Sequence, residues 1–242
     1  MKRPVALALA LSLTASVGAL APATAEEPAE GAKSAILLIG DGMSLAQVYS
    51  AQIFAEEVLG DSLAMPGIAD TAVTSTHALD SMVTDSAAAG TAIHSGYKAD
   101  NGSINVLPAG EWTHTIGQAA QAAGKSVGIL STARMTHATP ASVYGHDPDR
   151  DAENLFAEQM LEFRPQVALG GGARAFVPDG KREDGRDLIA EMVELGYTNV
   201  TDAEELAAVD TESTEYLLGL FTSSHMSYEI DRVNDVRAEP SL

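Results

Sequence analysis

The chain of 242 residues has no cysteine, only one tryptophan and far fewer basic than acidic residues. Without cysteine it can form neither a disulfide nor a thiolate metal site, and it has no thiol nucleophile. Any metal would therefore be held by oxygen or imidazole nitrogen. With 14 Lys and Arg against 34 Asp and Glu, the formal charge is −20, which argues against nucleic acid or an anionic membrane as a partner. An anionic substrate would need local compensation from metal ions, an arginine or backbone amides.

Long apolar runs are scarce, and one of them lies in the first 25 residues. Two basic residues are followed by apolar residues 5–13 and by a small-residue ending at residues 23–25, which is typical of a secretory signal peptide. We expect cleavage after Ala25 and export to the periplasm or the cell exterior. A transmembrane anchor is the alternative, but the apolar stretch is short for one. Residues 26–242 would then be one domain without a membrane anchor.

Helical and strand-like segments alternate in the second half of the chain. We expect helices at about 113–123, 151–163, 184–195 and 202–208, and strands at 126–131, 166–169, 198–200 and 216–222. Such alternation implies parallel strands joined by right-handed crossovers. The predicted fold class is α/β, with a layered, mostly parallel sheet flanked by helices.

The first half of the chain offers weaker signals. The apolar run Ser34–Gly40 predicts a strand buried on both faces, and residues 44–59 predict a helix. Residues 65–78 predict a short strand and a loop. Asp100-Asn-Gly-Ser103 is a turn sequence.

Asp85 and Ser86 stand directly before a run of small helix formers, so we expect a helix from Ser86 to about Ser95. One interpretation is an ordinary helix N-cap. The other is a nucleophile at a helix start, where unpaired N–H groups and a partial positive charge suit a phosphate group. A serine nucleophile must be activated by a base, an electrostatic site or a metal.

Four further polar residues follow predicted strands, and ligands of parallel sheets gather at the carboxyl ends of strands. Asp41 lies between two glycines, and its carboxylate with the Thr139 hydroxyl and water is an oxygen set suited to Mg²⁺. His137 is suited to a supporting position more than to direct ligation. Arg150 could bind two phosphate oxygens as a fork. The alternatives are a turn residue for Asp41 and a surface ion pair with nearby aspartates for Arg150.

Several motifs, in this order and with this spacing, resemble alkaline phosphatase. They are Leu37–Met43, Val83–Ala88, Gly96–Ile104 and Thr136–Ala141, followed by Val167–Ala173, Leu217–Phe221 and Met226–Arg232. The resemblance implies an alkaline phosphatase-like fold and phosphomonoester hydrolysis, with phosphate monoesters as substrates, two Zn²⁺ and one Mg²⁺. It also implies that the protein can form a homodimer.

The resemblance implies roles for individual residues. Ser86 resembles the nucleophile that becomes phosphoserine, its hydroxyl activated by a zinc ion, and Arg150 resembles the arginine that holds the phosphate. Asp85 resembles the acidic neighbour that orients this arginine.

The metal ligands follow from the same motifs. Asp41 resembles an aspartate bridging a zinc and the magnesium, and Thr139 resembles a magnesium ligand. His137 stands beside that magnesium, as a direct ligand or one step removed.

The family resemblance also implies a second half with the main zinc ligands, and after Arg150 the only histidine is His225. We therefore expect this chain to be the N-terminal portion of an alkaline phosphatase, incomplete in its C-terminal half and insufficient for activity alone. The alternative is an inactive exported fragment that binds Mg²⁺ or phosphate. A metal-free serine hydrolase is disfavoured, because no Gly-x-Ser-x-Gly motif surrounds Ser86.

Overall fold

The computed structural model of the chain describes residues 33–67, 70, 72–232 and 238–241. The predicted signal peptide lies outside these residues. The chain divides into two units, one ending at Ile39 and one that starts at Gly40. Within the described ranges, no helix is both long enough and apolar enough to cross a membrane.

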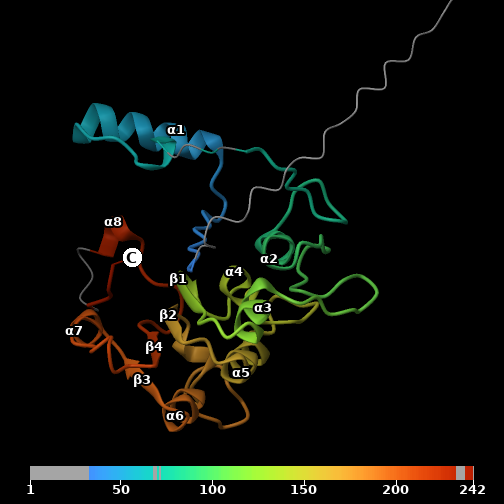
Figure 1. The fold of residues 1–242 in the computed structure, drawn as a ribbon, viewed down its shortest axis with the longest axis vertical. Coiled ribbons are helices and arrows are strands. Elements are labelled where there is room, and N and C mark those ends of the chain that lie inside the picture. The colour runs from blue at the N-terminus through green and yellow to red at the C-terminus, as the bar shows by residue number, and fades with distance from the viewer. Residues whose placement is uncertain (1–32, 68–69, 71, 233–237, 242) are drawn as a thin grey trace, which may run out of the picture. The chain divides into compact units, whose positions relative to one another are not determined.

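A sheet of four parallel strands confirms the predicted fold class. The strands are β1 (Gly128–Arg134), β2 (Val167–Gly171), β3 (Tyr197–Val200) and β4 (Tyr216–Leu220), in the order β1-β2-β4-β3 (Figure 1). The register pairs Ile129 with Ala168, and Ala168 with Leu218. Because all strands are parallel, their carboxyl ends lie at one edge of the sheet, where α/β proteins bind their ligands.

Short helices connect and flank the strands. The α-helices are α1 (Leu45–Phe54), α2 (Ser86–Ser95), α3 (Ile116–Ala122), α4 (Ala138–Ala141), α5 (Glu153–Phe163), α6 (Leu188–Glu194), α7 (Ala203–Ala207) and α8 (Glu229–Arg232). A π-helical turn, η1 (Ala55–Leu59), follows α1, and 3-10 turns form η2 (Met65–Gly67) and η3 (Ala173–Ala175). The helices and strands predicted after Trp112 are confirmed within a few residues at their ends.

Two strand predictions are wrong. Ser34–Gly40 contains no strand, and neither do the described residues of the 65–78 segment, where Met65–Gly67 form a 3-10 turn. A strand needs a neighbour to accept and donate its backbone hydrogen bonds. Among the described residues, the structure gives neither segment such a neighbour, although both are apolar or β-branched.

The core lies between the sheet and its helices. Helix α5 contributes Phe156 and Met160, four positions apart and therefore on one helix face, and α6 contributes Leu188 and Met192 with the same spacing. All four side chains are fully buried. The core thus fixes the sheet, and two candidate site residues, His137 and Thr139, follow the carboxyl end of β1.

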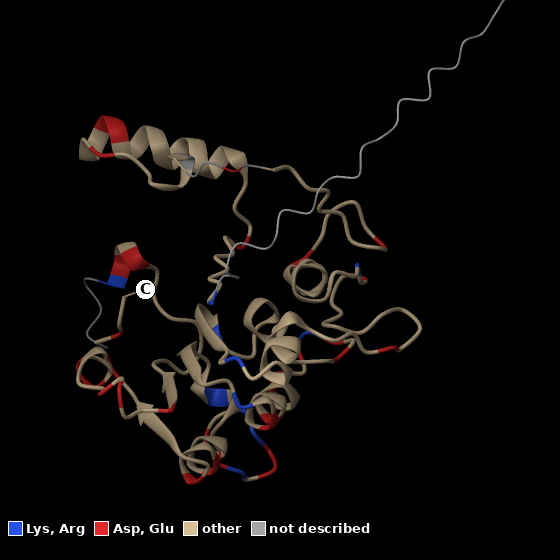
Figure 2. Cartoon of the chain, viewed as in Figure 1, with Lys and Arg blue, Asp and Glu red and all other residues tan. Residues whose placement is uncertain are grey.

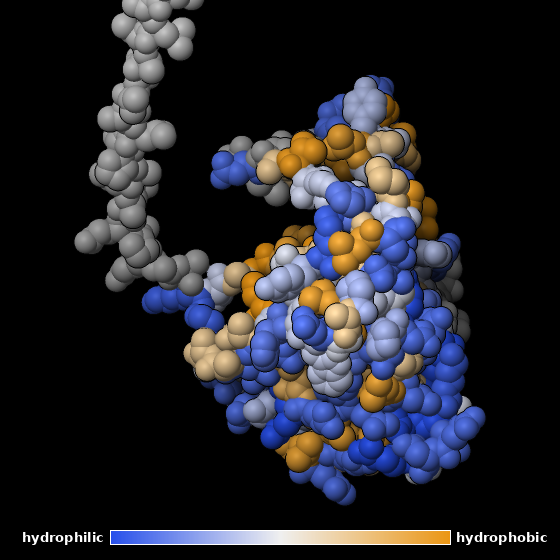
Figure 3. All heavy atoms as spheres, turned by 90° about the vertical axis from the view of Figure 1, so that its right-hand side faces the viewer, coloured by the Kyte–Doolittle hydropathy of each residue, from blue (hydrophilic) through white to orange (hydrophobic). Residues whose placement is uncertain are grey.

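Charged and apolar side chains share the surface. Acidic residues are spread over α6, α7 and α8 (Figure 2). Large apolar side chains are exposed too, including Tyr49 on α1 and Ile116 on α3, and apolar patches interrupt the polar face drawn in Figure 3.

Candidate active site

Ser86 is the first residue of α2, and Asp85 is its N-cap. The Asp85 backbone is extended, and its carboxylate accepts a hydrogen bond from the N–H of Ala88 at 2.9 Å. This bond satisfies one of the N–H groups that have no partner inside the helix. The predicted helix start is confirmed, and because Asp85 does the capping, the Ser86 hydroxyl is available for another contact.

That contact is the carboxylate of Asp41. The Ser86 hydroxyl donates to it, with Oγ 2.9 Å from Oδ1 and 3.0 Å from Oδ2. The Thr139 hydroxyl donates to Oδ2 of the same carboxylate at 3.0 Å. Asp41 itself lies in a turn closed by a hydrogen bond from the N–H of Met43 to the carbonyl of Gly40. The exposed carboxylate of Asp41 therefore accepts hydrogen bonds from two hydroxyl groups that are distant from it in the sequence.

Arg150 is held on the other side of the helix start. Its Nη1 donates to Asp85 Oδ2 at 2.9 Å, and its Nη2 lies 3.1 Å from Nε2 of His137. Since arginine can only donate, His137 Nε2 must be the acceptor, and its proton is assigned to Nδ1. That Nδ1 is buried without a hydrogen-bond partner. His137 therefore supports the arginine in this arrangement.

Burial and charge set the protonation of this group. Burial alone would raise the pKa of Asp85, but hydrogen bonds from the N–H groups of Ala88 and Gly102 and the Arg150 guanidinium outweigh it, so the pKa is lowered. Burial also lowers the pKa of His137, and the positive charge of Arg150 adds to the effect. Asp85 is thus kept ionised and His137 kept neutral, as their contacts with Arg150 require.

The five residues singled out in the sequence come together as two connected groups. Asp41, Ser86 and Thr139 form one, and Arg150 with His137 forms the other. They are joined along the chain, because Asp85 precedes Ser86 and His137 is two residues from Thr139.

The donor set of the first group suits a hard cation. A carboxylate and two hydroxyls are oxygen donors of the kind that Mg²⁺ takes together with water, and Asp41 is exposed, which leaves room for water. Zinc is different, because it needs three or four protein ligands. The residues that the structure describes contain no group of three or more His, Asp or Glu that could hold a metal. They fit magnesium in part and do not by themselves fit zinc.

A cluster of charges around Glu153 lies next to this site and was missed from the sequence. The buried carboxylate of Glu153 pairs with Arg134 at 3.1 Å, Arg174 at 3.3 Å and Lys181 at 3.6 Å. Burial would raise the pKa of Glu153, but these three cations lower it. The ring of His225, which contacts Arg134, lies edge-on to the ring of His137 at 5.2 Å.

The turn at Asn101 and Gly102 also contacts the site, which was not predicted from the sequence. The Asn101 side chain bonds to the backbone of Asp85 and Val83, and the Gly102 N–H donates to the Asp85 carboxylate. The sequence signal was an Asn-Gly turn sequence, which predicts the turn but says nothing of what its side chain contacts.

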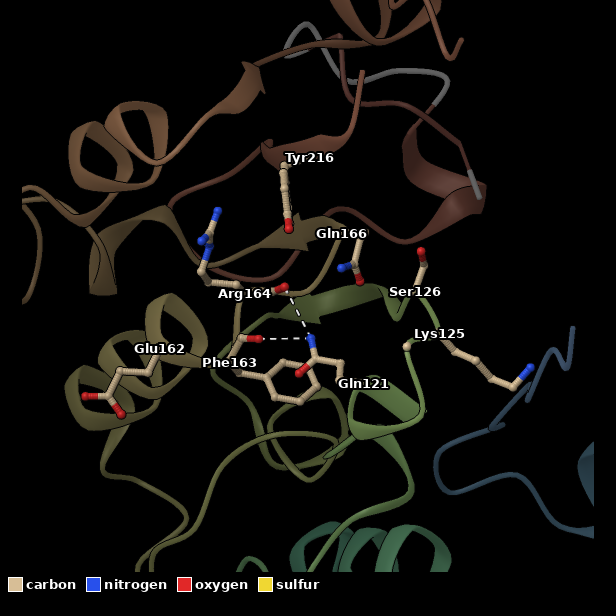
Figure 4. A pocket seen from close by; sticks show the side chains of 9 residues that line it. Gln121, Lys125, Ser126, Glu162, Phe163, Arg164, Gln166 and Tyr216 are labelled. Carbon is tan, nitrogen blue, oxygen red and sulfur yellow. Dashed lines mark hydrogen bonds between the residues drawn. The ribbon is translucent and has the colours of Figure 1, made fainter. Parts of the chain in front are cut away.

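A hollow of about 340 Å³ lies elsewhere, at the amino ends of the strands. It is lined by residues that precede β1 and β2, such as Lys125 and Arg164, and by Tyr216 (Figure 4). Within it, Gln121 donates to the carbonyl of Phe163 at 2.9 Å. None of the candidate site residues lines this hollow.

The fold is a parallel α/β sheet, and beside the carboxyl end of β1 the chain brings together the first residue of α2, a carboxylate and an arginine held by its neighbours. The family model of alkaline phosphatase matches residues 32–242. The chain belongs to the alkaline phosphatase family.

Individual relatives agree. Alkaline phosphatase 3 of Bacillus subtilis is 33% identical over 249 residues, covering 97% of this chain and 51% of that protein. The crystal structure of Thermus thermophilus alkaline phosphatase matches with a TM-score of 0.77 and 40% identity, covering 83% of this chain and 42% of that one. A variant of TAB5 alkaline phosphatase with Mg bound in its M3 site matches with a TM-score of 0.65 and 26% identity, over 74% of this chain and 51% of that one. The chain spans about half the length of the relatives it matches.

Proposed function

We propose that this chain serves phosphomonoester hydrolysis through a phosphoserine at Ser86. The observation that carries the proposal is the pairing of two contacts at the start of α2: Ser86 with Asp41, and Asp85 with Arg150. Since Asp85 and Ser86 are adjacent, these contacts support a site in which the Ser86 hydroxyl lies near the Arg150 guanidinium, a group that can bind two phosphate oxygens. Membership of the alkaline phosphatase family supports the same reaction.

The chemistry has two displacements. In the first, the Ser86 oxygen attacks phosphorus, the bond from phosphorus to the ester oxygen breaks, and the alcohol leaves. In the second, water attacks the phosphoserine, and phosphate leaves as the serine hydroxyl is restored. Arg150 stabilises negative charge on the non-bridging oxygens in both steps, and the N–H groups at the start of α2 favour an anion there.

Asp85 and His137 prepare Arg150 for this role. Asp85 fixes one end of the guanidinium, and neutral His137 accepts from the other end. An arginine whose orientation is fixed before the phosphate arrives loses less conformational freedom on binding.

Asp41 and Thr139 are the residues that would hold Mg²⁺, with His137 beside them. A divalent cation, when bound, supplies positive charge that favours the serine alkoxide and neutralises the phosphoryl group. The prediction of two zinc ions stays a prediction, since the described residues do not supply their ligands. Export, the homodimer and the single domain at residues 26–242 likewise stay predictions.

The test is chemical trapping of the intermediate. The protein, supplied with Zn²⁺ and Mg²⁺, is mixed with a ³²P-labelled phosphomonoester and quenched in acid. Label is expected on Ser86, located by mass spectrometry of the digested protein, and S86A should lose it. Because the described residues do not supply the zinc ligands, repeated turnover of p-nitrophenyl phosphate should stay low.

The matched control is S95A, at the other end of the same helix. The Ser95 hydroxyl donates to the carbonyl of Thr91 at 2.7 Å and accepts from the N–H of Tyr97 at 3.2 Å. Neither contact involves a candidate site residue, so its loss should leave labelling unchanged. Binding of phosphate without any labelling or turnover would contradict the proposal and favour an inactive, ligand-binding chain. Labelling that survives in S86A would also contradict it.

A further inference from the structure

The turn Asp100–Ser103 lies between the two halves of the candidate active site. The N–H of Ser103 donates to the carbonyl of Asp100 at 3.1 Å and closes the turn. Gly102 has φ of +87°, which glycine adopts without strain and other residues rarely do. The backbone N–H of Asn101 donates to Asp80 Oδ1 at 2.9 Å, which anchors the turn to the segment that leads toward α2.

The Asn101 side chain holds the backbone directly before the nucleophile. Its Oδ1 accepts from the N–H of Asp85 at 2.8 Å, and its Nδ2 donates to the carbonyl of Val83 at 2.9 Å. Only this orientation of the amide makes both bonds, since the reverse would oppose donor to donor and acceptor to acceptor. One side chain thus fixes two backbone groups within three residues of Ser86.

Gly102 ties the same segment to the arginine loop. Its N–H donates to Asp85 Oδ2 at 2.9 Å, and its carbonyl accepts from the backbone N–H of Arg150 at 2.8 Å. The Arg150 guanidinium returns to the same Asp85 oxygen. The bonds therefore form a closed ring through Asp85, Gly102 and Arg150, and Asn101 fastens that ring to the chain before α2.

We propose that Asn101 is a positioning residue that sets where Ser86 stands relative to Arg150. The inference rests on the proposed phosphoryl transfer at Ser86. Transfer requires the attacking oxygen to lie in line with the leaving oxygen while Arg150 holds the phosphate, and a displacement of roughly 1 Å can cost about 100-fold in rate. Asn101 acts through Asp85 and Val83, and the reaction needs no contact between Asn101 and the phosphate.

The experiment measures the rate constant of Ser86 labelling in rapid-quench mixing, using p-nitrophenyl phosphate labelled with ³²P and the full chain supplied with Zn²⁺ and Mg²⁺. N101A is expected to label about 10- to 100-fold more slowly than wild type. N101D keeps an acceptor for the Asp85 N–H and loses the donor to Val83, so its rate constant should lie between those of wild type and N101A. N199A, on β3 at the edge of the sheet, is the control and should label at the wild-type rate.

Rate constant and amplitude separate positioning from stability. A merely structural asparagine would lower the fraction of molecules that label and leave the rate constant of the remainder unchanged. That result, or an unchanged rate constant at full amplitude, would overturn the inference. Wild-type protein that never labels would instead refute the proposed function, which keeps the two failures apart.

Discussion

Replacement of Glu153 by glutamine should destabilise the protein, because the one carboxylate pairs with three cations. The side chain of Glu153 is only 10% exposed, and those of Arg134 and Arg174 are 14% and 24% exposed. Glutamine has nearly the same shape but no charge. E153Q therefore leaves the two arginines close together, largely buried and without a counter-ion.

The expected loss lies between two limits. Removing one partner of a fully buried ion pair costs about 3–5 kcal/mol, whereas exposed pairs contribute about 0–1 kcal/mol. The Glu153 cluster is mostly buried but open at Lys181, which is 52% exposed. We expect the free energy of unfolding to fall by about 2–3 kcal/mol at neutral pH.

The effect has a predictable dependence on pH. The pKa of Glu153 is lowered in the folded protein from an ordinary value of 4.5. The stabilisation is therefore complete above about pH 4.5 and is lost as the pH falls through the lowered folded pKa. The difference between wild type and E153Q should shrink over that acidic range.

Urea unfolding followed by far-UV circular dichroism, repeated from neutral to acidic pH, measures both effects. The control is E229Q, since Glu229 pairs with Arg232 at the surface and is 66% exposed, so its change should be small. If E153Q matched wild type at neutral pH, or if its deficit were the same at every pH, the electrostatic reasoning would be refuted.

Two further substitutions test the packing around the nucleophile helix. In G90A the new Cβ would lie only 2.8 Å from the Cβ of Ser142, so the free energy of unfolding should fall by about 1–3 kcal/mol. Urea unfolding should show this loss and its recovery in G90A/S142G. Equal stability of G90A and wild type would contradict the clash. The free energy of unfolding should rise by about 1 kcal/mol in H94L, since His94 is buried with neither ring nitrogen hydrogen-bonded. Burial lowers the pKa of His94 from 6.5, so the unfolded chain binds more protons in acid and the stability of wild type falls as the pH drops below about 6.5. Thermal unfolding of H94L should show a smaller fall in stability over this pH range. The same pH dependence in H94L and wild type would contradict the lowered pKa of His94.

Local chemistry made much of the fold predictable. Asp85 is an N-cap by residue type, and Gly96 ends the same helix in the left-handed conformation that the sequence context favours. Gly124 and Gly196, each with positive φ, likewise follow the ends of α3 and α6. Helix caps and helix-ending glycines act over a few residues, so they can be predicted from the local sequence alone.

Predictions that depend on a distant partner fared less evenly. Ser34–Gly40 has the composition of a buried strand, but composition cannot supply the neighbouring strand that makes one. The Glu153 cluster draws Arg134, Arg174 and Lys181 from three separate segments, and no local pattern marks them as partners. Asp41, Ser86, Thr139 and Arg150 could be singled out as candidates from residue type and position, but only the family resemblance implied that they act at one site.

Because the site residues are far apart in the sequence, they are added to the growing chain at different times during synthesis. Asp85 and Arg150 are 65 residues apart, and Asp41 and Thr139 are 98 apart. At about 5–20 residues per second, a ribosome adds Arg150 roughly 3–13 s after Asp85. During that interval the residues of α2 have been made but Arg150 has not. All the candidate site residues are therefore translated when only β1 of the four strands exists, before β2, β3 and β4.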